Sequence, residues 1–233
     1  GLKNLGAQAI IAKLSTQKMI IPVGISIAST NKKYQNEEEQ IQDIAACFKL
    51  FEHSALSHAY YELNISCPNT FGGEPFTTPA KLKRLITHID KLHISRPVYI
   101  KMPIDLSETD TLSLLEVLNS HDVQGVIFGN LTKDHSNPDI HPDDRLAWKK
   151  MPGNLSGKPT WNRSNQCIAL CRKHFKKRFT IIGTGGIFSG ADAEQKMSFG
   201  ADLVQLITGL IYQGPQLIGQ INEHLAKEQE ALL

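Results

Sequence analysis

The sequence predicts an α/β protein with a parallel sheet, and two observations lead to this class. Aliphatic runs of strand length alternate with helical patterns along the chain. The runs are continuously apolar, which is typical of parallel strands buried on both faces. We therefore expect a series of β-then-α units, of which the sequence contains six.

The elements follow in a regular order, and each is indicated by its residue types. β-Branched and aliphatic residues dominate the expected strands, 20–27, 60–65, 98–102, 125–129, 180–183 and 203–207. Apolar residues recur at helical spacing in the expected helices, 37–51, 79–92, 109–121, 161–173, 190–199 and 216–227. Another helix-like segment, 5–13, precedes the first strand.

The position of the polar residues favours a barrel over a doubly wound sheet. In a (β/α)8 TIM barrel the functional groups follow the carboxyl ends of many strands, whereas a doubly wound sheet concentrates them at one crevice. Here they follow every strand: Ser26, 64–69, Lys101, Asn130, 183–186 and 208–209. Because six units are two fewer than closure requires, we expect strands three to eight of a barrel, without its first two β/α units, in one domain over residues 1–233.

Composition excludes several classes of protein. The 233 residues are 41% hydrophobic and 21% charged, and the net charge is +2. Lysine and arginine are spread along the chain, so nothing indicates a nucleic-acid partner or an anionic membrane surface. The apolar runs are too short to span a bilayer and no signal-peptide pattern opens the sequence, so a cytoplasmic protein is expected.

The four cysteines separate into two kinds. Their positions, 47, 67, 167 and 171, have no metal-ligand spacing, so no metal site is expected. Cys47, Cys167 and Cys171 lie in helical segments and are expected to face the core, as free cysteines commonly do. Cys67 instead ends a strand among polar residues, where a chemical role is expected.

The strand that ends at Cys67 carries the strongest candidate site. Its sequence is Tyr-Glu-Leu-Asn-Ile-Ser-Cys-Pro-Asn-Thr over residues 61–70. A thiol flanked by amides suits a site that holds a planar polar ligand and takes a proton from it. Ser66 is an alternative base, but strand alternation directs it to the opposite face.

Two late loops resemble a phosphate-binding cup. Gly183-Thr184-Gly185-Gly186 follows one strand, and Thr208-Gly209 follows the next. In barrels the loops after strands seven and eight often bind phosphate through backbone N–H groups and a helix N-terminus. The alternative interpretation is that these glycines only form tight turns.

Five motifs together resemble dihydroorotate dehydrogenase. They are Asn-Ile-Ser-Cys-Pro-Asn-Thr at 64–70, Lys-Met-Pro-Ile-Asp-Leu-Ser at 101–107, Leu-Ser-Gly-Lys-Pro at 155–159, Ile-Ile-Gly-Thr-Gly-Gly-Ile at 181–187 and Leu-Val-Gln-Leu-Ile-Thr-Gly at 203–209. They occur in the order and spacing of that family, and the similarity extends to about residue 225. The resemblance implies an FMN-dependent barrel that oxidises dihydroorotate to orotate in de novo pyrimidine biosynthesis.

The resemblance also assigns roles to individual residues. It implies that Cys67 is the catalytic base, which accepts a proton while a hydride passes to FMN. It implies that the substrate is bound by Asn64, Asn69 and Asn130. The implied cofactor-binding residues are Asn64, Lys101, Gly129, Gly157, Gly185, Gly186, Ile207 and Thr208, the last two through backbone N–H groups to the phosphate.

The motifs combine features of two classes of that family. Cys at position 67 resembles the soluble class 1 enzymes, whereas segments 105–107 and 155–159 resemble the quinone-using class 2 enzymes. Ser26 stands where class 2 has a flavin-contacting Asn. Quinone, fumarate and NAD stay open as electron acceptors, and a class 2 N-terminal region would imply peripheral attachment to the cytoplasmic membrane face.

Two alternatives to this function stay open. One is an FMN barrel oxidoreductase that acts on another pyrimidine-like ring. The other is a non-catalytic barrel remnant that binds no flavin. No feature of the sequence sets the oligomeric state.

Overall fold

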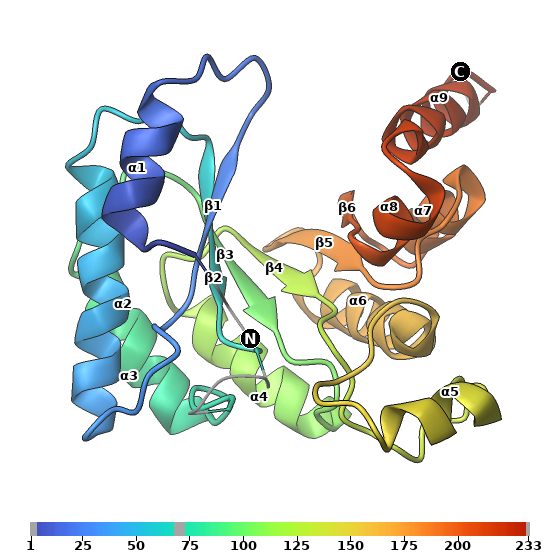
Figure 1. The fold of residues 1–233 in the computed structure, drawn as a ribbon, viewed down its shortest axis with the longest axis horizontal. Coiled ribbons are helices and arrows are strands. Elements are labelled where there is room, and N and C mark those ends of the chain that lie inside the picture. The colour runs from blue at the N-terminus through green and yellow to red at the C-terminus, as the bar shows by residue number, and fades with distance from the viewer. Residues whose placement is uncertain (1–3, 68–72, 232–233) are drawn as a thin grey trace. The chain divides into compact units, whose positions relative to one another are not determined.

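The strands follow one another in the sheet in the order of the chain. The computed structural model describes residues 4–67 and 73–231. The strands are β1 (Gly24–Ile27), β2 (Tyr60–Asn64), β3 (Val98–Met102), β4 (Gly125–Phe128), β5 (Thr180–Thr184) and β6 (Leu203–Gln205) (Figure 1). The pairs β1–β2, β2–β3 and β5–β6 are parallel. This sequential order confirms the predicted α/β class and differs from a doubly wound sheet, whose strand order reverses.

The helices occur where the apolar periodicity predicts them. They are α1 (Ala7–Ser15), α2 (Glu37–Glu52), α3 (Pro79–Asp90), α4 (Glu108–Asn119), α5 (Pro142–Trp148), α6 (Trp161–Phe175), α7 (Gly190–Ser198), α8 (Thr208–Gln213) and α9 (Gln216–Ala231), with a 3-10 turn at Lys158–Thr160. The sequence prediction missed α5, α8 and the 3-10 turn. Each is too short to show a helical period.

Two strands are shorter than the sequence predicts by more than one residue. The first predicted strand covers residues 20–27, yet β1 begins at Gly24, and Ile20 and Ile21 are 83% and 69% exposed. Pro22 lies between them and Gly24 and has no backbone N–H to donate to a neighbouring strand. The last predicted strand covers residues 203–207, but Ile207 already caps α8.

The chain divides into two compact units. Unit 1 comprises residues 1–101 and 113–125, and unit 2 comprises residues 102–112 and 126–233. Helix α4 contributes residues to both. The expectation of one domain over residues 1–233 stays a prediction, and the units are described separately below.

Unit 1 is held together by the apolar face of α2 against the sheet. Asn36 begins this helix, because its side chain accepts a hydrogen bond from the backbone N–H of Glu39 at 2.9 Å. Within the helix, Phe48 is fully buried and its ring lies 5.0 Å from that of Tyr61 in β2. Helix α2 also contacts α1, α3 and β1, so it links the elements that position the end of β2.

Unit 2 is organised around β5 and the helices that follow it. Helix α6 packs on β5, and α7 packs on both β6 and α9. Ser189 caps α7 by accepting a hydrogen bond from the backbone N–H of Asp192 at 3.1 Å. A small apolar core fixes α9 to this unit and consists of Ile187, Ala193, Leu217 and Ile221.

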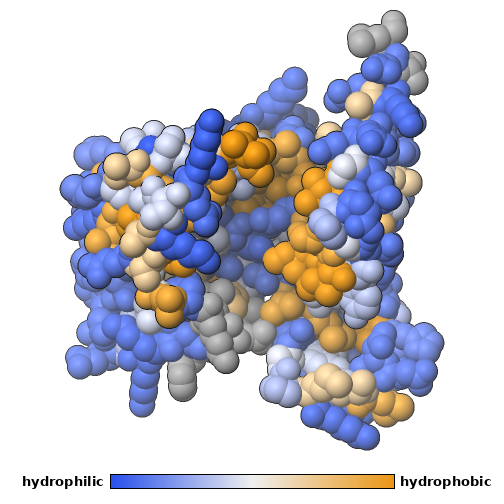
Figure 2. All heavy atoms as spheres, turned by 45° about the horizontal axis from the view of Figure 1, so that its top comes forward, coloured by the Kyte–Doolittle hydropathy of each residue, from blue (hydrophilic) through white to orange (hydrophobic). Residues whose placement is uncertain are grey.

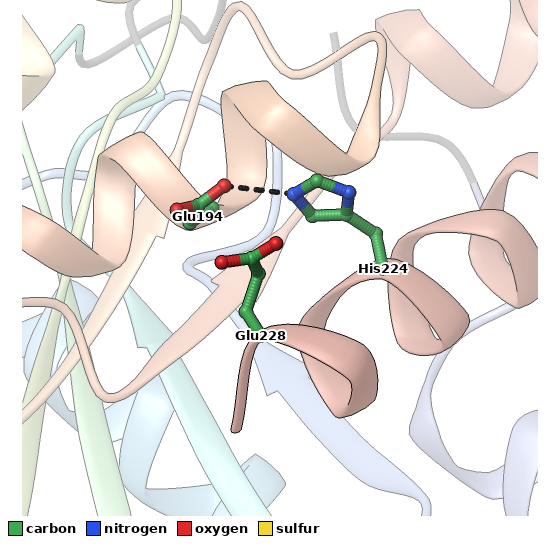
Figure 3. A group of neighbouring side chains, drawn as sticks. All are labelled: Glu194, His224 and Glu228. Carbon is green, nitrogen blue, oxygen red and sulfur yellow. Dashed lines mark hydrogen bonds and ion pairs between the residues drawn. The ribbon is translucent and has the colours of Figure 1, made fainter. Parts of the chain in front are cut away.

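A polar group on the surface also joins α7 to α9. His224 Nε2 lies 2.8 Å from Glu194 Oε2, and Glu228 stands one helical turn further along α9 (Figure 3). The ligand atoms of the three residues lie within 4.8 Å of one another, which is close enough to hold a cation. The contact between His224 and Glu194 links the two helices.

Several large apolar side chains are exposed in the segment that runs from the end of α7 into α9. The exposed members are Phe199, Leu203, Ile207, Ile211, Tyr212 and Ile218. Apolar residues exposed on the surface are visible as orange spheres in Figure 2. Among them, Ile207 is 68% exposed, so its side chain adds little to the apolar core of this unit.

Membrane-spanning helices are not found in the described parts of the chain. None of the helices there combines the length and the apolar character needed to cross a bilayer.

Truncating Phe48 should destabilise unit 1 far more than truncating its exposed neighbour. We expect Phe48→Ala to lower the free energy of unfolding by about 3–5 kcal/mol, because it leaves a cavity beside Tyr61. Leu50, on the same helix, is 39% exposed, and Leu50→Ala should cost less than about 1 kcal/mol. Denaturant unfolding followed by circular dichroism measures both, and equal losses would contradict this packing.

Candidate active site

Three of the predicted site residues, Asn64, Cys67 and Lys101, lie at the carboxyl end of the β2–β3 pair in unit 1. Asn64 and Cys67 line a small pocket there together with Ser29, Phe76 and other residues of this unit. Lys101 is the register partner of Asn64 on the neighbouring strand β3. Unit 1 therefore brings three of the predicted residues together. Asn69 lies outside the described residues.

Asn64 is oriented by the residue that competes with Cys67 for the role of base. Its Oδ1 atom accepts hydrogen bonds from the backbone N–H of Ser66 at 3.1 Å and from Ser66 Oγ at 3.3 Å. Ser66 is fully buried, in contrast to the half-buried Cys67. Since Oδ1 is engaged, Asn64 can offer its Nδ2 amide to a ligand as a donor.

The other cysteines have inert surroundings. Cys167 and Cys171 are buried, at 1% and 0% exposure, as the sequence predicts, and Cys47 is half-buried. Burial raises the pKa of Cys47 and Cys167 to about 11 and that of Cys171 to about 12. These three thiols stay protonated and unreactive at neutral pH. Cys67, in contrast, lines a pocket together with Asn64, a predicted substrate residue.

Lys101 has a carboxylate neighbour that the sequence interpretation missed. Its Nζ lies 3.7 Å from Oε1 of Glu62, a residue of β2 that is 5% exposed. Ser26 donates a hydrogen bond to the same oxygen at 2.7 Å. A glutamate within an otherwise apolar strand was the available signal, since a buried carboxylate requires a partner.

In unit 2, the end of β4 is shaped by close packing on β5. Gly129 has a φ of +125°, and a Cβ there would lie 2.5 Å from the backbone oxygen of Thr184. No side chain fits this position, so the close approach of Thr184 requires glycine here. The next residue, Asn130, is half-buried, and its Oδ1 accepts the backbone N–H of Leu131 at 2.9 Å.

Asp105 fixes the loop that follows Asn130. Its carboxylate accepts hydrogen bonds from Thr132 Oγ1 at 2.8 Å and from the backbone N–H of Lys133 at 2.6 Å. Thr132 also exchanges backbone hydrogen bonds with Leu155. The acidic residue of the second motif is therefore a support for the segment that carries Asn130.

The predicted cofactor residues of unit 2 lie on three loops that pack against one another. Ser156 Oγ lies 3.0 Å from Thr208 Oγ1, and a Cβ on Gly157 would come within 2.9 Å of Thr208 Cγ2. A Cβ on Gly185 would collide with Thr160. Gly157 and Gly185 have positive φ angles of +81° and +96°, which other residues rarely adopt.

Gly186 completes this arrangement beside α6. Its φ is +75°, and a Cβ there would lie 2.9 Å from Cβ and Cε3 of Trp161. Ile207 and Thr208 stand at the start of α8, where backbone N–H groups lack partners within the helix. Unit 2 thus brings together Gly157, Gly185, Gly186 and Thr208.

A buried lysine, Lys196, packs against the segments that carry these glycine loops. Lys196 is fully buried, and its Nζ donates to Ser164 Oγ at 3.1 Å and to Asn165 Oδ1 at 2.8 Å. The same nitrogen lies 4.4 Å from the centre of the Trp161 ring. Gly183 provides the space, because a Cβ there would lie 2.5 Å from Lys196 Cδ.

Ser164 extends this network to β4. Its Oγ donates a hydrogen bond to the backbone oxygen of Phe128 at 3.1 Å, directly before Gly129. Sequence reasoning missed Lys196, because a lysine in a helical pattern predicts a solvated position.

Comparison with known proteins places this chain in a family. The sequence profile of dihydroorotate dehydrogenase matches residues 1–228. The chain belongs to the dihydroorotate dehydrogenase family. A dihydroorotate dehydrogenase (quinone) of Xylella fastidiosa is 35% identical over 242 residues, which cover 99% of this chain and 66% of that protein. Its namesake from Hamiltonella defensa is 34% identical, with 97% and 66% covered.

Solved structures of the dihydroorotate dehydrogenase family share the fold. DHODH of Eimeria tenella in complex with ferulenol matches with a TM-score of 0.75 and 23% identity, over 88% of this chain and 57% of that one. The ligand-free form matches with a TM-score of 0.77 and 20% identity, over 94% and 66%. This chain thus spans 66% of the length of the curated relatives named above.

The stability of the protein should rise with pH above neutrality because of Lys196. Desolvation lowers the pKa of Lys196 to about 7, an effect that Asp192 opposes and Lys158 reinforces. Between pH 7 and about 10, the unfolded state binds a proton that the folded state lacks, so the free energy of unfolding increases by up to ~1.4 kcal/mol per pH unit. Below pH 7 both states are protonated and this contribution is constant.

Denaturant unfolding at pH 7 and pH 9 measures this dependence. Lys196→Met should abolish the rise, whereas Lys173→Met, which removes an exposed lysine of α6, should leave it intact. The same rise in Lys196→Met and in the unmodified protein would assign the effect to another group.

Proposed function

We propose that the protein catalyses flavin-dependent oxidation of dihydroorotate to orotate in de novo pyrimidine biosynthesis, with FMN as cofactor. The observation that carries this proposal is the half-buried Cys67 thiol, which shares a pocket with Asn64. Lys101 lies beside Asn64 in the register of β2 and β3. Membership of the dihydroorotate dehydrogenase family supports the same reaction.

Cys67 is the base in this proposal. Oxidation of the dihydropyrimidine ring removes a hydride from one ring carbon and a proton from its neighbour, and FMN, when bound, accepts the hydride. The Cys67 thiolate takes the proton at Sγ, and the carbon–hydrogen bond electrons form the new ring double bond. A thiol suits this step because it forms its anion far more readily than the hydroxyl of a serine does.

Amide side chains hold the substrate ring. Asn64, Asn69 and Asn130 offer donors and acceptors that match the alternating N–H and C=O groups of a pyrimidine edge. The bond from Ser66 fixes the orientation of Asn64, so that its Nδ2 is available as a donor. Asp105 accepts two hydrogen bonds from the loop that follows Asn130, and these bonds restrict the motion of that loop.

The loops of unit 2 fit the phosphate end of FMN. Gly157, Gly185 and Gly186 adopt positive φ angles in loops so closely packed that added side chains would collide. Such loops present backbone N–H groups that an anion can approach. Gly129, Ile207 and Thr208 complete the proposed cofactor site, and Lys101 supplies the positive charge for the flavin ring.

A quinone is the proposed second electron acceptor. The relatives from Xylella fastidiosa and Hamiltonella defensa are both named as quinone-type enzymes. A cytoplasmic location, with peripheral attachment to the membrane that holds the quinone, is consistent with this acceptor. Fumarate and NAD are the competing acceptors. Turnover of dihydroorotate with each of the three compounds distinguishes them.

Replacement of Cys67 tests the proposed base. We expect Cys67→Ala to slow reduction of bound flavin by dihydroorotate at neutral pH by roughly 10²–10⁴-fold, because no base is left at this position. Cys47→Ala, on α2, is the matched control and should reduce flavin at the unmodified rate. Stopped-flow bleaching of the flavin absorbance measures both rates.

The same samples separate the alternatives. Rapid flavin reduction by Cys67→Ala would overturn the assignment of the base. If bound orotate leaves the flavin spectrum unchanged, another pyrimidine-like ring is the substrate. A protein that stays colourless after addition of FMN would be a non-catalytic remnant.

Substitution at Gly186 tests the proposed phosphate loop. Gly186→Ala places a Cβ against Trp161 at a strained φ and should weaken FMN binding by roughly tenfold or more. Gly219→Ala, in α9, meets nothing within 4 Å and should leave FMN affinity unchanged. Fluorescence titration with FMN measures affinity, and circular dichroism checks that both variants fold. Equal affinities in folded variants would exclude this loop from the cofactor site.

A further inference from the structure

Glu62 is a buried acid in the middle of the strand that leads to Cys67. It is 5% exposed, and its neighbours in β2, Tyr61 and Leu63, are fully buried. A carboxylate in such surroundings is costly unless it is hydrogen-bonded and paired with a cation. Its partners therefore indicate why it is there.

The carboxylate of Glu62 connects three strands at one point. Ser26 of β1, its register partner, donates a hydrogen bond to Oε1 at 2.7 Å. On the other side, Lys101 Nζ of β3 lies 3.7 Å from the same oxygen. The side chain of Lys101 is 17% exposed, so solvent screens the pair less than it screens a surface ion pair.

The pleat of the sheet places this pair on the face of the candidate site. Residues two apart in a strand share a face, so Glu62 lies on the same face as Asn64. Lys101 is the register partner of Asn64, and Glu62 reaches it diagonally across β2 and β3. Glu62 thus lies on the same face as Asn64 and Lys101, which are proposed to contact substrate and flavin, and two residues before Asn64 in the strand.

We propose that Glu62 is a positioning residue that holds the Lys101 ammonium group at the flavin ring and limits how much positive charge that ring experiences. The inference rests on the proposed function of the site. Ser26 keeps the carboxylate in place through its hydrogen bond. Because Glu62 partly compensates the charge of Lys101, it weakens the preference of the site for the negative charge that a flavin gains on reduction.

Glu62→Gln tests this role, because glutamine keeps the shape of the side chain and removes its charge. Glu62→Gln should shift the midpoint potential of the bound flavin in the positive direction. Reduced FMN should bind more tightly relative to oxidised FMN by roughly tenfold, because the negative charge that Glu62 places beside Lys101 is then removed. A purely structural role would reduce stability without this shift.

Glu52 provides a matched control in the same unit. Its carboxylate accepts hydrogen bonds from Tyr61 Oη at 2.7 Å and from the backbone N–H of Ser95 at 2.9 Å, and it lies 3.6 Å from Arg96. Glu52→Gln removes a comparable, partly buried charge that pairs with Arg96, whereas Glu62 pairs with Lys101. A potential shift in Glu62→Gln that is no larger than in Glu52→Gln, or that is negative, would overturn the proposal.

A second measurement needs no flavin. Acylation of lysines in the FMN-free protein, followed by peptide mass spectrometry, reports how firmly each amine is held. Lys101 should react several-fold faster in Glu62→Gln than in the unmodified protein or Glu52→Gln. Lys158, which pairs with Asp192 at 3.2 Å, should react equally in all three and serves as internal reference.

The two measurements separate failure of the inference from failure of the proposed function. If the unmodified protein binds no FMN, the proposed function fails, and the acylation rate alone decides whether Glu62 holds Lys101. An unchanged Lys101 rate would overturn the inference even in a protein that binds FMN. If Glu62→Gln does not fold, Ser26→Ala replaces it and should raise the Lys101 rate to a smaller extent.

Discussion

The parallel register of β1, β2 and β3 is the constraint on which the candidate site of unit 1 depends. It places Asn64 beside Lys101 and Ser26 beside Glu62. A slip of one residue would turn each of these side chains to the opposite face of the sheet. The apolar contacts beneath β2, above all that of Phe48 with Tyr61, therefore position the polar groups at its end.

A different constraint operates in unit 2, where the absence of side chains determines the geometry. Gly129, Gly157, Gly185 and Gly186 stand where neighbouring segments approach too closely for a Cβ. The buried Lys196 donates a hydrogen bond to Ser164 in the same unit, and Gly183 leaves the space that the Lys196 side chain occupies. Both units follow one principle, since each costly feature is maintained by specific neighbours.

Much of the fold could be predicted from the sequence because the strands and long helices have clear apolar patterns. The limits of β3, residues 98–102, agree with the prediction, and α2 differs by one residue. Errors occurred where local chemistry overrides the pattern. Pro22 shortened the first strand, and α5 and α8 are too short for a period to be visible.

The sequence by itself determined the residue types of the candidate site: the thiol of Cys67, the amides of Asn64 and Asn130, and the glycines of the late loops. Motif order and strand ends suffice for this, because functional groups of parallel α/β proteins follow the strands. Only the tertiary structure decided the partners. The sequence shows an acid within one strand and a lysine within one helix, but the burial and pairing of Glu62 and Lys196 depend on segments that are distant in sequence.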